Sequence, residues 1–177
     1  LSEEKSQGVG AIRFKNPTKQ TQQFSFSVNR MTAGQPEMAV IRFKIKKSFI
    51  TSPENTSEFT RGGKLPSAVK QFLKPSPYIE SNSKEIRKIA SELEDESLNA
   101  WSQVEKNYVW VRDNIEYKFD KQIHSCLRAL DVKHGDCEEL SSLFIAICRA
   151  QGIPARAVWI PGHTYPEFYL TDANKDG

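Results

Sequence analysis

Cys137 combines a nucleophilic side chain with a position that would activate it. Asp136 followed by Glu139 predicts a capping box, which makes Cys137 the first residue of a helix. The free N–H groups and positive dipole end of a helix favour a thiolate, and with a cationic partner they bring a cysteine pKa from ~8.5 to roughly 3.5–7.5. The same N–H groups could stabilise an oxyanion on an attacked carbonyl. Glu138 and Glu139 oppose thiolate formation, so an imidazolium would have to supply the remainder.

His163 is the predicted partner of this cysteine among the three histidines of the chain. It follows Pro161-Gly162 and opens a strand-like run, close to where a sheet would lie beneath the Cys137 helix. His134 precedes Cys137 by only three residues, so a contact with it is an alternative of cramped geometry. His124 falls in a loop, and a cysteine without any histidine partner is the remaining alternative.

The other thiols indicate no chemistry of their own. The chain has three cysteines, so at least one must be free. Cys148 lies on an apolar helical stripe and is expected in the core, and Cys126 is expected to be inert or buried. The spacings of His124, Cys126, His134 and Cys137 are irregular and lack a Cys-x-x-Cys pair, so we expect no zinc site. No acidic loop has the ligand spacing of a calcium site, and we expect no metal and no cofactor.

The elements that must position these residues change in character along the chain. Residues 8–50 contain two stretches of period-two alternation, which predict strands with one buried face. The alternating apolar residues are Phe24, Phe26, Val28, Ile41, Phe43 and Ile45. Residues 51–64 are rich in Ser, Pro, Asn, Thr and Gly and predict a loop. We therefore divide the chain into a β-rich segment, 1–64, and a core, 65–177.

Helical spacing dominates the core. Helical spacing begins directly after Ser83, a predicted N-cap, and recurs over residues 101–115 and 137–148. Gly152 followed by Pro154 predicts the end of the last helix. The remaining stretches predict short strands, at 115–119, 158–160 and 168–170.

Length and composition limit the function classes. The 177 residues suffice for one domain with an appended segment, and 38% hydrophobic with 27% charged residues is typical of a soluble globular chain. The net charge of +3 does not indicate a nucleic-acid partner. No run approaches the ~18 consecutive apolar residues of a membrane span. The chain starts at Leu1 without a signal-peptide pattern, so we expect a processed or engineered N-terminus.

Four segments carry a resemblance to a known family. They are residues 72–78, 110–117, the run Gly135-Asp136-Cys137-Glu138-Glu139 with its apolar helix, and residues 152–156. In this order and spacing they resemble the core of the transglutaminase-like superfamily. The resemblance implies a papain-like α+β fold, in which the nucleophile helix packs on an antiparallel sheet, and a Cys-His-Asp triad that acts through a thioester. By motif, Cys137 is the nucleophile and His163 the general base and acid. The family more often has Ala-Trp after this histidine, so Thr164-Tyr165 indicates a divergent, microbial-type member.

The third triad residue is the least certain match to the family pattern. In the family this aspartate lies on the strand after the histidine strand, which would begin beyond Gly177, so we expect the core to be truncated at its C-terminal end. Asp172 is the candidate within the chain, but nine extended residues would place it about 30 Å from His163. Tyr117 could donate a hydrogen bond to the oxyanion, as an upstream aromatic does in some relatives. Its alternation with Ile115 and Phe119 favours core packing instead.

The resemblance implies acyl transfer at an amide or peptide bond of a peptide or protein substrate. Water would resolve the thioester in a protease or amidase, and an amine would resolve it in a cross-linking enzyme. We favour peptide hydrolysis, because no amine channel is recognisable. The alternative is a catalytically weak or inactive module that binds peptides on the same fold. A third reading is that the β segment 8–50 docks a protein partner by an exposed edge strand.

Overall fold

A computed structural model describes residues 9–18, 21–28, 30–34, 51, 53–63 and 65–172. The chain divides into two compact units, Leu1–Thr51 and Ser52–Gly177. In the first unit, strands β1 (Val9–Thr18) and β2 (Thr21–Val28) form an antiparallel hairpin. This confirms the predicted strand at residues 24–28, whereas the one predicted at 41–45 lies outside the described residues.

The predicted buried face of this hairpin is wrong at Phe26, which is 56% exposed. Within the described residues of the first unit, β1 and β2 pair only with each other. A two-stranded sheet buries a face only where another layer covers it, so alternation alone does not produce burial.

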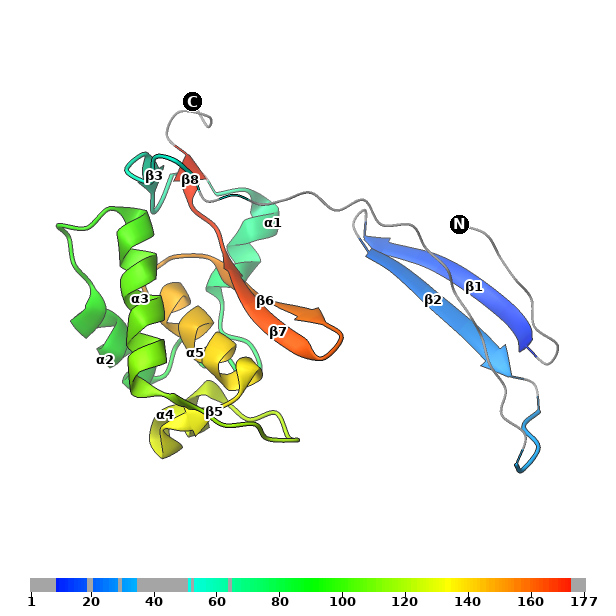
Figure 1. The fold of residues 1–177 in the computed structure, drawn as a ribbon. Coiled ribbons are helices and arrows are strands. Elements are labelled where there is room, and N and C mark those ends of the chain that lie inside the picture. Colours follow the sequence, from blue (N-terminus) through cyan, green and yellow to red (C-terminus); the bar gives the residue numbers. More distant parts are fainter. Residues whose placement is uncertain are drawn as a thin grey trace. The chain divides into compact units, whose positions relative to one another are not determined.

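The second unit is an α+β domain built around one helix (Figure 1). Its elements in chain order are β3 (Phe59–Thr60), α1 (Ser67–Lys70), the 3-10 helix η1 (Gln71–Leu73), α2 (Lys84–Leu93), α3 (Ala100–Asn114), β4 (Glu116–Tyr117), α4 (Cys126–Val132), β5 (His134–Gly135), α5 (Cys137–Ala150), β6 (Ala155–Ile160), β7 (His163–Phe168) and β8 (Thr171–Asp172). Helix α5 lies between α2, α3 and α4 on one side and the β6–β7 hairpin on the other. The predicted fold class, a nucleophile helix on an antiparallel sheet, is confirmed.

Helix α5 is the centre of the core because its sequence is apolar on more than one face. Leu143, Ile145 and Ile147 are fully buried, and so is Cys148. The helix ends at Ala150, and the predicted stop signal, Gly152, follows with a φ of +78°, which favours glycine. A helix that is buried nearly all round can hold its first residue rigidly against the neighbouring strand.

The β6–β7 hairpin places the histidine. Its antiparallel register runs from Ala155 opposite Phe168 to Ile160 opposite His163. The turn between the strands contains Gly162, with a φ of +76°. His163 is therefore the first residue of β7. Beyond β7, the chain forms β8, which pairs with β3 rather than extending the hairpin. Residues 59–60 thus belong to the second unit, and the domain boundary after residue 64 stays a prediction.

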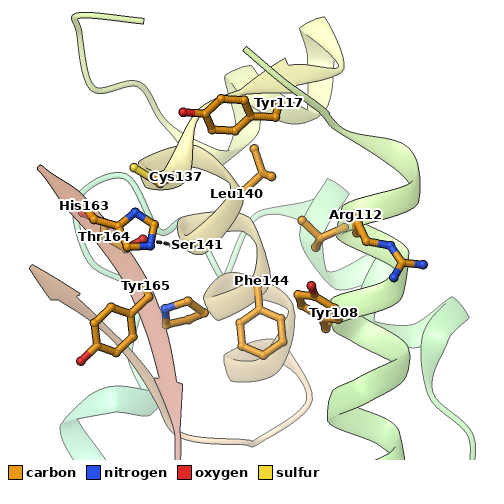
Figure 2. A pocket seen from close by; sticks show the side chains of 12 residues that line it. Tyr108, Arg112, Tyr117, Cys137, Leu140, Ser141, Phe144, His163, Thr164 and Tyr165 are labelled. Carbon is orange, nitrogen blue, oxygen red and sulfur yellow. Dashed lines mark hydrogen bonds between the residues drawn. The ribbon is translucent and has the colours of Figure 1, made fainter. Parts of the chain in front are cut away.

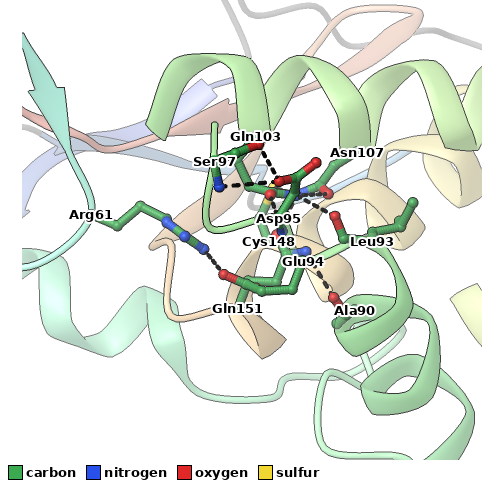
Figure 3. Close-up of polar contacts among 10 residues, drawn as sticks. All are labelled: Arg61, Ala90, Leu93, Glu94, Asp95, Ser97, Gln103, Asn107, Cys148 and Gln151. Carbon is green, nitrogen blue, oxygen red and sulfur yellow. Dashed lines mark hydrogen bonds and ion pairs between the residues drawn. The ribbon is translucent and has the colours of Figure 1, made fainter. Parts of the chain in front are cut away.

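A buried polar network joins the helices behind the core (Figure 3). Asn107 on α3 donates to Gln151 Oε1 at the end of α5, with the atoms 2.6 Å apart. Gln151 in turn donates to the carbonyl of Ala90 on α2 (2.9 Å), and Gln103 on α3 donates to the carbonyl of Leu93 (3.1 Å). Because these side chains are paired, the network fixes α2 and α3 against α5 without leaving a buried polar group unsatisfied.

None of the helices in the described ranges has both the length and the apolar character that crossing a lipid bilayer requires.

Candidate active site

The first turn of α5 presents Cys137 at its N-terminus. Asp136 Oδ1 accepts from the backbone N–H of Glu138 (3.0 Å), and Glu139 Oε2 accepts from the backbone N–H of Asp136 (3.0 Å). The predicted capping box is therefore confirmed. At Gly135 an added Cβ would lie 2.6 Å from Glu139 Cβ. The motif needs glycine at position 135 because the backbone there lies directly against the side chain of Glu139, a member of the capping box.

Cys137 and His163 line the same cavity, which has a volume of about 380 Å³ (Figure 2). One face of α5 forms the floor, with Leu140 and Phe144 following Cys137 at helical spacing. Strand β7 forms one wall, and α3 contributes the opposite wall. The polar side chains Cys137 and His163 therefore face a mainly apolar space between a helix and a strand. His163 and the neighbouring Tyr165 are exposed at its rim.

The environment of Cys137 holds the thiol in its neutral form. Burial raises the pKa of the half-buried Cys137, and the hydrogen bond from its thiol to Glu138 Oε2 (3.0 Å) raises it further. The backbone N–H of Thr164 on β7 acts in the opposite direction and lowers the pKa. The expected depression of this pKa is therefore not seen, because burial and the hydrogen bond that the thiol donates to the adjacent carboxylate both disfavour the thiolate.

The other two cysteines are sealed in the core, as expected. Cys126 is fully buried, donates to Glu80 Oε2 (2.9 Å) and has its pKa raised by burial. Cys148 is also fully buried, and burial raises its pKa to about 12. All three cysteines are free thiols. Cys137 is thus the thiol that an outside reactant can reach.

The structure separates the three histidines. His134 lies on β5 and, together with His124, lines a separate cavity of about 260 Å³, the His134 cavity. His124 Nε2 lies 3.2 Å from Asp120 Oδ2. His163 is the one that lines the Cys137 cavity.

Metal donors gather at the same helix end. Ligand atoms of Asp136, Cys137 and Glu138 lie within 4.8 Å of one another. Asp136 already caps the helix, and the other two residues hydrogen-bond each other. These contacts account for the cluster without an ion, and three consecutive residues do not surround a metal as a structural zinc site does.

Comparison with known families agrees with this geometry. A family model described as the Transglutaminase-like superfamily matches residues 87–175. The chain belongs to the transglutaminase-like superfamily. The crystal structure of a proposed cysteine protease from Cytophaga hutchinsonii is similar, with a TM-score of 0.52 and 27% sequence identity. The match covers 63% of this chain and 43% of that protein, so this chain spans less than half of its length. Among curated proteins, none matches the chain.

Among the described residues, no aspartate lines the cavity beside His163, where the family resemblance implies a third triad residue. Asp172 lies on β8, opposite Phe59, and does not line the cavity. Glu167, two residues farther along the same face as Tyr165, instead accepts two hydrogen bonds from Arg156 (2.9 and 2.7 Å). Among the described residues that line the cavity, none is acidic. That an aspartate beyond Gly177 orients the His163 imidazole stays a prediction.

Tyr117 lies at the cavity and not in the core, which corrects the packing expectation. It is 64% exposed, and Figure 2 shows its ring over the first turn of α5. Ile115 is buried as alternation requires, but Phe119 is 70% exposed. The reason is that β4 is only two residues long and pairs in parallel with the two residues of β5. Such a short sheet has no continuous buried face.

Thr164 also lines this site, although the sequence pattern assigns it no role in the chemistry. Its side chain is 1% exposed, and its hydroxyl has no hydrogen-bond partner among the described residues. Its carbonyl accepts from the hydroxyl of Ser141 at 3.4 Å. The feature of the sequence that indicates a place for Thr164 at the site is its position directly after His163. Side chains alternate along a strand, and this position lies on the face of β7 that is turned toward α5.

Proposed function

We propose that this transglutaminase-like chain hydrolyses amide or peptide bonds through a thioester on Cys137. One observation carries the proposal: the accessible thiol at the start of α5 and the imidazole at the start of β7 line one cavity. A nucleophile at a helix N-terminus with a base opposite it is the arrangement that acyl transfer by a cysteine requires. Family membership and the similarity to a proposed cysteine protease support the same reading.

The reaction begins when the Cys137 thiol turns from Glu138 to His163 and transfers its proton to the imidazole. The thiolate attacks the carbonyl carbon, and backbone N–H groups of α5 stabilise the oxyanion. His163 then gives the proton to the leaving nitrogen, the C–N bond breaks, and a thioester remains on Cys137. Water attacks the thioester and loses its proton to His163. The S–C bond breaks, the acid is released, and the proton returns to the thiolate.

Hydrolysis is preferred over cross-linking because the cavity is open at its rim. Tyr117 is 64% exposed, and His163 and Tyr165 are exposed on the opposite side. Water therefore reaches the position at which the thioester would form. A cross-linking enzyme must keep water away from the thioester so that an amine can react first.

A non-catalytic peptide-binding module is the second candidate function. Two observations favour it: the raised pKa of Cys137, caused first by burial, and the lack of an acidic side chain among the described residues that line the cavity. Without an orienting carboxylate, the imidazole is less well held in its productive tautomer.

The test measures cleavage of a fluorogenic peptide library and of a denatured protein. We expect new carboxyl termini that carry ¹⁸O when the reaction runs in H₂¹⁸O, and a thioester on Cys137 detectable by mass spectrometry after acid quenching. Cys137→Ala and His163→Ala should abolish turnover, whereas His134→Ala, in the His134 cavity, should retain it. If the product carries an added primary amine instead of ¹⁸O, the reaction is transamidation and not hydrolysis. Binding without any covalent intermediate would favour the second candidate.

A further inference from the structure

A second apolar cavity adjoins the one that holds Cys137. It has a volume of about 270 Å³ and shares Tyr108, Phe144 and Pro166 with the Cys137 cavity as common walls. Trp101 and Phe168 complete it at the end away from the cysteine. The two cavities therefore lie next to each other between α3 and β7, over α5, in a row that we call the path.

Aromatic side chains line this path and remain partly accessible. Trp101 packs against Phe168 with ring centroids 5.7 Å apart, and Phe168 packs edge-on against Phe144 at 6.4 Å. The Trp101 indole N–H donates to Glu105 Oε1 (3.0 Å), which fixes the orientation of the ring. Trp101 and Phe168 are half-buried, and Tyr108 is 57% exposed. A row of oriented, incompletely covered aromatic rings is suited to receive another apolar side chain.

The spacing along α5 shows which part of a substrate would reach the second cavity. Phe144 follows Cys137 by seven residues, and seven residues of α-helix rise about 10.5 Å. An extended peptide advances ~3.3 Å per residue. In a peptide that lies extended along α5, a side chain about three residues from the attacked carbonyl would therefore fall over Phe144, which lines both cavities.

We infer that the second cavity is a specificity subsite for a large apolar or aromatic side chain, about three residues from the bond attacked at Cys137. This inference rests on the proposed function and names its substrate class: extended peptides with a residue such as Phe, Tyr or Leu at that distance. An acidic side chain is disfavoured, because it would lose its hydration against Trp101 and Phe168 and meet the carboxylate of Glu105.

Binding to Cys137→Ser isolates the subsite from the chemistry. Labelled decapeptides of one scaffold carry Phe, Ala or Asp at each position in turn, and anisotropy gives their Kd values. We expect one position at which the Phe peptide binds at least tenfold tighter than the Asp peptide. This position should lie two to four residues from the bond that is held at residue 137. Adding Trp101→Ala should remove this preference. Trp159→Ala is the matched control, because Trp159 is 58% exposed and lines neither cavity.

Glu105→Gln provides a second test, because it removes the negative charge but keeps an oxygen that can accept from the Trp101 indole N–H. It should make the Asp peptide at the preferred position bind more tightly while the Phe peptide changes little. Equal binding of Phe and Asp peptides at every position, or a preference that survives both Trp101→Ala and Glu105→Gln, would overturn the subsite. Cleavage of the same peptides by the unmodified chain is measured separately. If the preferred peptide binds but is never cleaved, the proposed function fails and the subsite remains.

Discussion

The thiol of Cys137 donates a hydrogen bond to Oε2 of Glu138, the next residue of the chain, over 3.0 Å. This contact directs the proton of the nucleophile toward a carboxylate instead of toward His163. Burial and the Glu138 contact together raise the pKa of Cys137, so the free site holds a neutral thiol near pH 7. In the proposed reaction, activation therefore includes a change of partner, from Glu138 to His163, which a bound substrate would bring about by displacing the carboxylate.

Glu138→Gln should make Cys137 more reactive in the absence of substrate. The substitution keeps the shape of the side chain but removes the negative charge that opposes ionisation, so the pKa of the thiol falls. The measurement is the rate of iodoacetamide labelling of Cys137 between pH 5 and pH 10, followed by mass spectrometry. We expect the midpoint of this profile to shift to lower pH. Glu116→Gln, at an exposed position on β4, is the control. A midpoint that stays in place, or moves upward, would show that Glu138 does not suppress the thiolate.

Gly135→Ala should loosen the start of α5. The new Cβ would meet Glu139 Cβ at 2.6 Å, and both atoms are attached to the backbone, so the cap must shift. We expect a loss of about 1–3 kcal/mol in the free energy of unfolding and a marked fall in turnover. Gly62→Ala is the matched control: its φ of +111° disfavours alanine, but nothing lies within 4 Å of the new Cβ. Urea unfolding and turnover are measured on both variants, and the control should lose stability without a comparable loss of turnover. Equal behaviour of the two would contradict a steric role for Gly135.

The parts of the fold that could be predicted from sequence are those set by neighbouring residues. The caps at Ser83 and Asp136 depend on side chains within three positions of the N–H groups that they satisfy, so pattern and geometry agree. The helical stripe of α5 is equally local. The pairing of Cys137 with His163 is predicted by the ordered family pattern. The strand expected after the Pro161-Gly162 turn predicts the same pair. Both residues line one cavity because the β6–β7 hairpin packs on α5.

The features that could not be predicted depend on contacts between distant segments or on single rotamers. Tyr117 lies at the cavity because β4 meets β5, which is far along the chain, for only two residues. The choice of Glu138 as partner of the thiol depends on the side-chain torsions of one glutamate, which no periodicity encodes. The second cavity combines Trp101 of α3 with Phe168 of β7, which are brought together only by the packing of both elements on α5.

Asn107→Ala should destabilise the domain through its polar core (Figure 3). Asn107 is fully buried, and its amide donates to Gln151 Oε1 and accepts from Gln103 Nε2 (3.2 Å). Its removal leaves both partners short of a hydrogen bond inside the protein, at a cost of about 1–3 kcal/mol. Asn114→Ala on the same helix is the control, since Asn114 is exposed and its loss should change stability by no more than about 0.5 kcal/mol. Urea denaturation followed by circular dichroism gives both values, and equal losses would rule out a special contribution from the network.

Tyr117→Phe tests whether the exposed phenol takes part in the reaction. The ring lies over the first turn of α5, beside the position at which an oxyanion would form on a carbonyl attacked by Cys137. Loss of one oxyanion donor lowers kcat by roughly 10²–10³-fold, and KM should change little because the ground-state carbonyl is held mainly by other contacts. Tyr165→Phe, which removes a hydroxyl from the opposite rim of the same cavity, should leave kcat within about twofold, because surface hydroxyls away from the reacting atoms contribute little. Steady-state kinetics on the best library peptide separates the two parameters. Equal losses of kcat in both variants would show that the Tyr117 hydroxyl has no special part in the reaction. If Tyr117→Phe raises only KM, the phenol positions substrate. In either case the backbone N–H groups of α5 stabilise the oxyanion without it.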